Sequence, residues 1–200
     1  MVKKTRDKFI EVARSLFARQ GVENTTMNDI ATASDKGRRT IYTYFKSKTE
    51  IFNAVIESET GDLVRELRLI VSLPTDPEQK LHDYVRTRLE KMNEIVRRNG
   101  SLRAGFFRDV RKVDRARAII AVKEIGLLMR ILQEGVDSGV FSVGSVKERA
   151  IIITNLIHGM DVPYIRNTLA EYSIGKEQIV DMVSDLIFRG IKKRRINDKN

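Results

Sequence analysis

Helical periodicity, interrupted by only three prolines, is the feature that most constrains the fold of this 200-residue chain. The prolines are Pro74, Pro77 and Pro163, so long stretches contain no residue that breaks a helix. Apolar residues recur at intervals of three and four along nearly the whole chain, whereas long alternating runs of β-branched residues are absent. The pattern therefore predicts an all-α protein.

The first 50 residues predict short helices with clear ends. Four apolar residues share one face of the first helix, over residues 6–20, and these are Phe9, Ala13, Leu16 and Phe17. Gly21 suits a left-handed C-cap at the end of that helix. Thr26 suits the N-cap of the second helix, with Asp29 completing a capping box.

Longer helices are expected in the rest of the chain. A capping box at 47–50 opens one that must end by Leu73, because prolines follow it. Further helices are predicted over 77–98, 114–138, 145–170 and 176–191, with a short segment at 102–112. Pro163 should kink or split the third of these, 145–170. The best domain boundary lies near Ser47 and gives an N-terminal domain at 1–47 and a larger one at 48–200.

A compact basic constellation occupies residues 26–48. It comprises a short helix, a four-residue turn and a second short helix, as in a helix-turn-helix that places its second helix in the major groove of DNA. Arg38 and Arg39 fall on the first turn of that second helix, where a guanidinium group can form paired hydrogen bonds with guanine. Ile41 and Phe45, four residues apart, are expected to face the core.

Polar side chains around this helix complete the expected contacts with DNA. Thr40 offers a hydroxyl and a methyl group, and Tyr42, Thr43 and Tyr44 are expected on the outer faces, where the tyrosine hydroxyls and Lys48 would bind phosphates. The residues that we expect to contact DNA are Thr26, Arg38, Arg39, Thr40, Tyr42, Thr43, Tyr44 and Lys48. A basic helix alone is more often a solvated surface, but two short helices, a fixed turn and a capped third helix together favour DNA binding.

Composition agrees with this interpretation and narrows the alternatives. The formal net charge is +10, which suits a polyanionic partner although surplus basic residues also keep proteins soluble. There is no cysteine, no apolar run of membrane-spanning length and no signal peptide, so we expect a cytoplasmic protein without disulfides. The two histidines, His82 and His158, lie far apart in sequence, and no phosphate-binding glycine loop or metal-ligand cluster is visible. We therefore expect no enzymatic activity, no metal and no cofactor.

About the first 50 residues resemble the TetR family of bacterial transcriptional regulators. The resemblance rests on Ala13, Leu16, Phe17, Gly21, Thr25, Thr26, Ile30, Ala31, the run 40–45, Ser47, Lys48 and Phe52. It implies an all-α homodimer in which three N-terminal helices bind DNA and a larger C-terminal helical domain binds an effector and dimerises. All of the expected DNA contacts except Thr43 fall where members of the family contact their operators.

The turn departs from the family pattern of alanine, glycine, a buried aliphatic residue and a serine cap. Here Ser34, Asp35, Lys36 and Gly37 take those four places. The loss of the aliphatic residue at Lys36 weakens the packing of the turn, and we expect Ser34 or Asp35 to compensate through a side-chain turn. Arg39 replaces a residue that is usually small, which implies a base-reading role and an operator different from that of the commonest members.

The C-terminal region, 48–200, is large enough for a second function. The resemblance implies that the last two long helices, 145–170 and 176–191, form a four-helix bundle across a dimer axis, and residues 151–153 are apolar on more than one face. An effector pocket is expected between the middle helices, lined by candidates from Tyr84, Met92, Arg103, Phe106, Phe107, Met129, His158 and Tyr164. Methionine and aromatic residues at helical spacing are more often plain core, and His158 is more often a core histidine than a ligand contact.

The leading functional hypothesis is a ligand-responsive transcriptional repressor. It would bind a two-fold-symmetric operator in double-stranded DNA as a homodimer and be released by a small-molecule effector. The alternative is a transcriptional activator or an architectural DNA-binding protein without small-molecule control. The sequence leaves open the effector, the operator, the regulated genes and the number of dimers on each operator.

Overall fold

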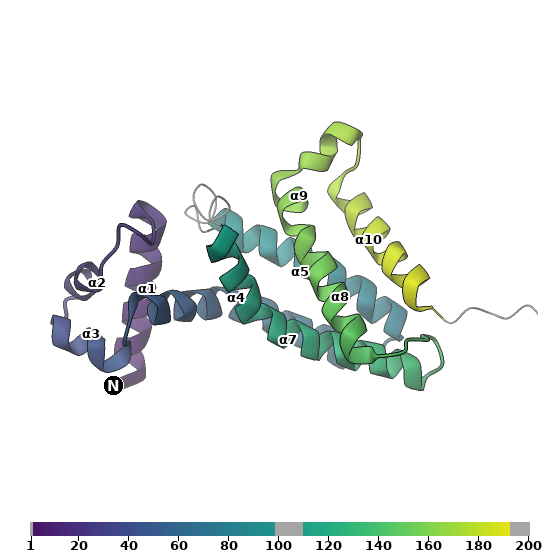
Figure 1. Ribbon diagram of the computed structural model, residues 1–200, viewed down its shortest axis with the longest axis horizontal. Coiled ribbons are helices and arrows are strands. Elements are labelled where there is room, and N and C mark those ends of the chain that lie inside the picture. The colour runs from purple at the N-terminus through teal and green to yellow at the C-terminus, as the bar shows by residue number, and fades with distance from the viewer. Residues whose placement is uncertain (1, 99–109, 193–200) are drawn as a thin grey trace, which may run out of the picture. The chain divides into compact units, whose positions relative to one another are not determined.

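The computed structural model describes residues 2–98 and 110–192 (Figure 1). Within this part of the chain the secondary structure is helical, apart from one isolated bridge between Phe141 and Lys192, so the all-α prediction is confirmed. The chain divides into two compact units, Met1–Asp62 with Ile95–Ile120, and Leu63–Glu94 with Ala121–Asn200. The boundary between functional domains near Ser47 stays a prediction.

The first unit contains α1 (Val2–Gln20), α2 (Met27–Ala33), α3 (Arg38–Tyr44) and the start of α4 (Lys48–Ser72). Its core joins α1 to the other three helices, and its largest members include Phe9, Phe17, Ile30, Ile41, Phe45, Ile51 and Phe52. Gly21 follows α1 with φ of 85°, which confirms the left-handed C-cap. Helix α1 begins four residues before the predicted position, because Val2, Lys3, Lys4 and Thr5 also adopt helical geometry.

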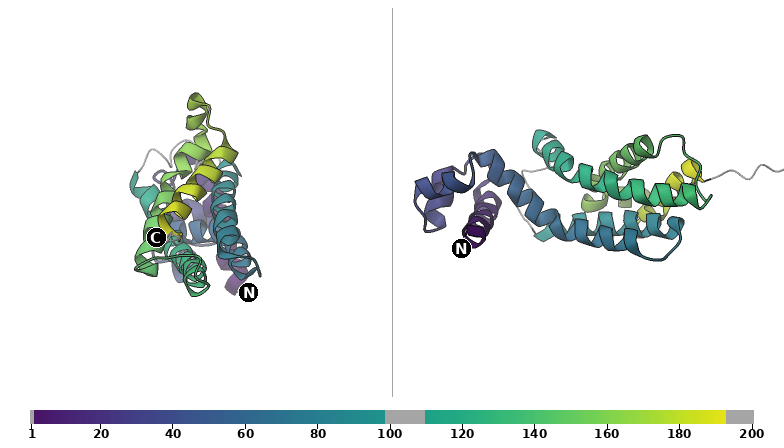
Figure 2. Two further views of the ribbon diagram at one scale, coloured as in Figure 1. Left: turned by 90° about the vertical axis from the view of Figure 1, so that its right-hand side faces the viewer. Right: turned by 90° about the horizontal axis from the view of Figure 1, so that it is seen from below.

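The second unit combines the rest of α4 with α5 (Pro77–Arg98) as far as Glu94, α7 (Val110–Asp137) from Ala121 onward, and the C-terminal helices. Those are α8 (Val146–Gly159), α9 (Asp161–Arg166), the 3₁₀-helix η2 (Thr168–Tyr172) and α10 (Lys176–Ile191). The end-on view of Figure 2 shows α10, in yellow, crossing in front of the green α8 and α9. None of the helices in the described residues is both long enough and apolar enough to cross a membrane.

The predicted bounds of α5 and α10 match the structure. Helix α7 begins at Val110, earlier than predicted, and residues 102–109 of the predicted short segment lie outside the described residues. The predicted break near Pro163 is confirmed, but it falls at Met160, three residues earlier. Pro163 is the third residue of α9, where its missing N–H has no helical carbonyl to bind, so the break comes before the proline.

Candidate nucleic-acid interface

Helix α2 begins with a complete capping box. The backbone N–H of Asp29 donates to the Thr26 hydroxyl at 3.1 Å, and the backbone N–H of Thr26 donates to the Asp29 carboxylate at 2.8 Å. The Thr26 backbone N–H first, and then the Thr26 hydroxyl, stabilise the Asp29 carboxylate and hold the pKa of Asp29 below its ordinary value. The predicted cap is confirmed, and it fixes where α2 starts.

The turn between α2 and α3 is closed by the backbone. The N–H groups of Asp35 and Lys36 donate to the carbonyls of Thr32 and Ala31, each at 3.0 Å. Asp35 adopts the left-handed conformation, with φ of 55°, at the place where the family pattern has glycine. The expected hydroxyl turn at Ser34 is wrong, because the Ser34 side chain is fully buried and its hydroxyl has no hydrogen-bond partner.

Helix α3 is anchored by the two residues that the sequence assigned to the core. Ile41 and Phe45 are buried, which confirms that prediction. Gly37 occupies the N-cap and supplies no side-chain bond. Arg38 and Arg39 are exposed on the first turn, next to the N-cap without a side-chain bond.

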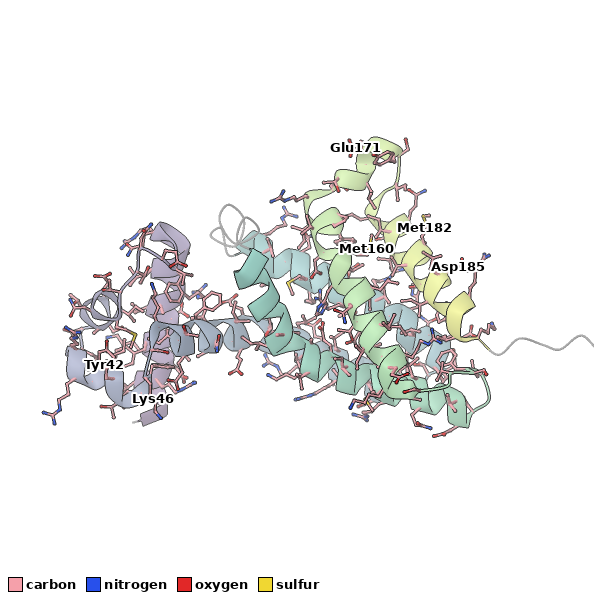
Figure 3. All side chains as sticks on the ribbon, viewed as in Figure 1. Tyr42, Lys46, Met160, Glu171, Met182 and Asp185 are labelled. Atoms are coloured by element: carbon pink, nitrogen blue, oxygen red, sulfur yellow. The ribbon has the colours of Figure 1, made fainter. Side chains whose placement is uncertain are left out.

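The remaining residues of α3 differ in exposure. Tyr42, labelled in Figure 3, is 43% exposed, and the Arg38 guanidinium lies over its ring at 5.9 Å from the centroid. Thr43 is exposed, with its hydroxyl donating to the Arg39 carbonyl at 3.2 Å, and Thr40 is half-buried. The expectation that Tyr44 lies on an outer face is wrong. Tyr44 is half-buried, and its ring centroid lies 5.7 Å from that of Phe9. Tyr44 follows Ile41 by three residues and so shares the core face of this two-turn helix.

Lys48 makes contacts that its sequence position did not indicate. Its ammonium donates to the backbone carbonyls of Val22 at 2.7 Å and Glu23 at 3.1 Å, in the corner between α1 and α2. The side chain is half-buried at the first residue of α4. The expected phosphate contact of Lys48 stays a prediction.

The second unit holds a buried network of charged groups centred on Arg88. Both terminal nitrogens of Arg88 donate to the Asp161 carboxylate, at 2.7 and 3.2 Å, and its Nε donates to Glu124. The other carboxylate oxygen of Glu124 lies 2.5 Å from Nε2 of His158. The network joins α5, α7, α8 and α9, and its four members, the Arg88 cluster, are Arg88, Glu124, His158 and Asp161.

Burial and pairing act against each other in the Arg88 cluster. Burial alone would lower the pKa of Arg88, but Glu124 and Asp161 outweigh it and raise that pKa. Burial alone would likewise raise the pKa of Glu124, but Arg88 and His158 outweigh it and lower that pKa. The cluster therefore keeps Arg88 and Glu124 ionised inside the unit.

The predicted effector residues are only partly brought together. Tyr84 and His158 both contact Glu124, and the Tyr84 hydroxyl lies 3.4 Å from the Glu124 carbonyl oxygen. Burial first, and then the negative charge of Glu124, raises the pKa of Tyr84. Tyr164 is buried on α9 beneath the Lys176 ammonium, 4.8 Å from its ring centroid. Two further candidates, Met92 and Met129, are half-buried, whereas three lie outside the described residues, namely Arg103, Phe106 and Phe107.

Arg88, Glu124 and Asp161 were missed by sequence reasoning. The available signal was a charged residue within an apolar stripe, since Arg88 lies between the inward Val85 and Leu89, and Glu124 lies four residues after the inward Ile120. Such a residue must find a partner in the core.

An apolar face is exposed on the two C-terminal helices. Ile152 and Leu156 of α8 are 61% and 40% exposed, and Met182 and Leu186 of α10 are 53% and 64% exposed. In each helix the two residues are four apart and so share one face. Figure 3 labels Met182 and Asp185 on α10.

Comparisons with known proteins agree with this architecture. The family model for bacterial regulatory proteins of the tetR family matches residues 9–55. The probable acrEF/envCD operon repressor of Escherichia coli K12 is 36% identical over 102 residues, which cover 50% of this chain and 46% of that protein. The chain thus spans about half the length of the first curated relatives that it matches.

Two further proteins are similar over nearly the whole chain. The transcriptional repressor NicS of Pseudomonas putida is 26% identical, with 95% of this chain and 93% of that protein covered. The second is the crystal structure of a putative TetR-family transcriptional regulator from Syntrophomonas wolfei, which superposes with a TM-score of 0.67 over 94% of each chain. The two sequences are 21% identical, so this likeness concerns the fold alone. Residues 9–55 therefore match the N-terminal domain of the tetR family of bacterial regulatory proteins, and the rest of the chain is similar to members of that family in fold.

Proposed function

We propose that the protein is a ligand-responsive transcriptional repressor that binds a two-fold-symmetric operator as a homodimer. The observation that carries the proposal is α3, a short helix fixed to the core by Ile41 and Phe45 while Arg38, Arg39 and Tyr42 are exposed. Proteins named as repressors, among them the acrEF/envCD repressor and NicS, are relatives of this chain. The site of action would be the cytoplasm, where a bacterial operator is accessible.

The candidate side chains divide by their expected role at the DNA. Arg38, Arg39 and Thr40 would reach base edges, and the hydroxyls of Tyr42 and Tyr44 would bind phosphates, with Thr26 and Thr43 beside them. Affinity should fall steeply with salt, by about 0.9 units of log K per unit of log salt for each phosphate neutralised. Selection from random duplex DNA followed by footprinting tests the proposal. A short palindromic site is the expected result, and binding that is independent of salt and of sequence would contradict it.

Arg39 is proposed to set operator preference. The change Arg39→Ala should relax the base preference at one operator position, because a paired bond to guanine is worth about 1–3 kcal/mol of discrimination. Binding assays against a set of single-base operator variants measure this effect. Equal weakening on every sequence would instead make Arg39 a phosphate contact.

The proposed homodimer uses the exposed apolar face of α8 and α10. A single helix-turn-helix reads few base pairs, and a two-fold dimer reads two half-sites. The double change Met182→Glu and Leu186→Glu should give a monomer by light scattering, whereas Leu69→Glu, which alters an exposed leucine of α4, should leave the dimer intact. A dimer that survives the double change would place the interface elsewhere.

The effector is proposed to bind the second unit among Tyr84, Met92, Met129, His158 and Tyr164, with Arg103, Phe106 and Phe107 as further candidates. We infer no enzymatic activity, since the relatives are transcriptional regulators. An activator or an architectural DNA-binding protein is the alternative. A reporter driven by the selected operator separates these functions, because deletion of the gene raises expression for a repressor and lowers it for an activator.

A further inference from the structure

Two arginines begin α3, and their side chains have different surroundings. The Arg38 guanidinium lies over the Tyr42 ring, 5.9 Å from its centroid, which is within the roughly 6 Å over which a ring attracts a cation. Tyr42 follows Arg38 by four residues, so the two side chains share one face of the helix. The residue four after Arg39 is Thr43, which has no ring and whose hydroxyl donates to the Arg39 carbonyl at 3.2 Å. The helix therefore offers a resting place to Arg38 that it does not offer to Arg39.

The ring beside Arg38 is attached to a firmly held backbone. Ile41, the residue before Tyr42, is fully buried, and Phe45, which ends the helix, is 1% exposed in the same core. Tyrosine has fewer side-chain torsions than arginine, which loses much rotamer freedom when it is fixed. The Tyr42 ring therefore restricts a side chain that would otherwise sample many conformations.

Contact with the ring leaves the hydrogen-bonding capacity of Arg38 intact. An aromatic ring attracts the face of a guanidinium group, whereas the N–H donors point outward from the edge of the guanidinium plane. Arg38 can therefore rest on Tyr42 and still donate two parallel bonds to O6 and N7 of a guanine. The Tyr42 hydroxyl lies at the edge of the ring and stays available for the phosphate contact proposed above.

We propose that Tyr42 is a positioning residue for Arg38, and that its ring, independently of its hydroxyl, sharpens the base preference at the operator position that Arg38 reads. At the preferred base the guanidinium binds while it rests on the ring. At any other base it must stay without its paired bonds or leave the ring, and an exposed contact of this kind is worth about 2- to 5-fold in the equilibrium. This inference rests on the proposed DNA-binding function.

Two substitutions in the full-length protein separate the Tyr42 ring from its hydroxyl. Tyr42→Phe removes the hydroxyl and keeps the ring, whereas Tyr42→Leu removes both. Tyr42 is 43% exposed, so both variants should unfold close to the wild-type urea midpoint. Arg38→Ala identifies the operator position that Arg38 reads, and Arg39→Ala identifies the position of Arg39, which serves as an internal control.

Binding to operators that differ by one base pair measures the preference. Tyr42→Phe should weaken binding to every sequence alike, because only a phosphate contact is lost. Tyr42→Leu should in addition lower discrimination at the Arg38 position by about 2- to 5-fold and leave discrimination at the Arg39 position unchanged. In the Arg38→Ala background, Tyr42→Leu should cause no further loss of discrimination.

Three binding results would overturn the proposal. The first is equal discrimination at the Arg38 position in Tyr42→Leu and Tyr42→Phe, and the second is an equal loss at the Arg38 and Arg39 positions in Tyr42→Leu. The third is an Arg38→Ala variant that weakens every sequence equally, because Arg38 would then be a phosphate contact.

Nuclear magnetic resonance of the protein without DNA detects the contact itself. A guanidinium over an aromatic ring brings its neighbouring CH₂ group into the ring current, so the Arg38 δ-proton signals should lie upfield of their ordinary position. The shift should persist in Tyr42→Phe and disappear in Tyr42→Leu, and its absence from the wild type would overturn the proposal. A wild type that selects no operator would refute the proposed function and this inference with it, whereas the other failures leave the proposed function standing.

Discussion

Removing Arg88 gives the most demanding test of the structure, because two carboxylates depend on it. Arg88 is 1% exposed and binds Asp161 through two nitrogens and Glu124 through a third. The change Arg88→Met keeps much of the side-chain volume and removes the charge. Glu124 and Asp161 then remain inside the unit without their cation.

The expected loss of unfolding free energy is about 3–5 kcal/mol, the usual cost of removing one partner from a buried ion pair. That loss is a large part of the roughly 5–15 kcal/mol that stabilises a typical domain. The matched control is Arg86→Met, two residues away on the same helix. Arg86 pairs with Glu177 at 3.4 Å on the surface, so its removal should cost less than about 1 kcal/mol.

The pH dependence of the two proteins should differ in sign. In the wild type the pKa of Glu124 is lowered, so its contribution is complete above the ordinary value of 4.5 and is lost as the pH falls through the folded-state pKa. In Arg88→Met burial acts with less opposition and should raise the Glu124 pKa above 4.5. The variant should therefore gain unfolding free energy as the pH falls from 7 to 5, whereas in the wild type the contribution of Glu124 stays constant over this range.

Urea unfolding followed by circular dichroism at pH 7 and pH 5 measures both effects. The triple change Arg88→Met, Glu124→Gln and Asp161→Asn should recover much of the loss at pH 7, since no buried charge is then left unpaired. A loss no larger than that of Arg86→Met, or a larger loss at pH 5 than at pH 7, would refute the reasoning.

Three substitutions test local features, each by the urea midpoint. Ser34→Ala should stabilise the protein by about 1 kcal/mol, because it removes a buried hydroxyl without a partner, and a loss would mean that the hydroxyl is satisfied. Gly21→Ala should cost about 1 kcal/mol through its positive φ alone, since no atom lies near an added Cβ. Gly135→Ala should cost more, about 1–3 kcal/mol, because its Cβ would overlap the Phe141 ring, and a neutral result would contradict that packing.

Local signals let the sequence predict much of the fold. Pro77 and the apolar periodicity of the two segments gave the bounds of α5 and α10, because such signals act within a few residues. The break before α9 was predicted three residues late, because proline is tolerated in the first turn of a helix and does not mark the break itself.

The site was less accessible to the same reasoning. Tyr44 was placed outward because only Ile41 and Phe45 were assigned to the core, although its spacing from Ile41 also puts it on the core face. The Arg88 cluster depends on pairs 34 to 73 residues apart, and the carbonyls that bind Lys48 are backbone groups, which carry no side-chain signal. Such contacts follow from the three-dimensional packing of helices.

The shared core of the first unit also limits how the DNA-binding segment can be transplanted. Helices α2 and α3 have seven residues each, below the length at which a helix is stable alone, so their shape depends on α1 and on Ile51, Phe52 and Val55 of α4. A chimaeric regulator made by joining residues 1–47 to a foreign domain would lose those side chains, together with Ala54 and Ile56 of the same core. A fusion point further along α4, beyond Ile56, would keep all the buried α4 side chains of this core with the DNA-binding helices.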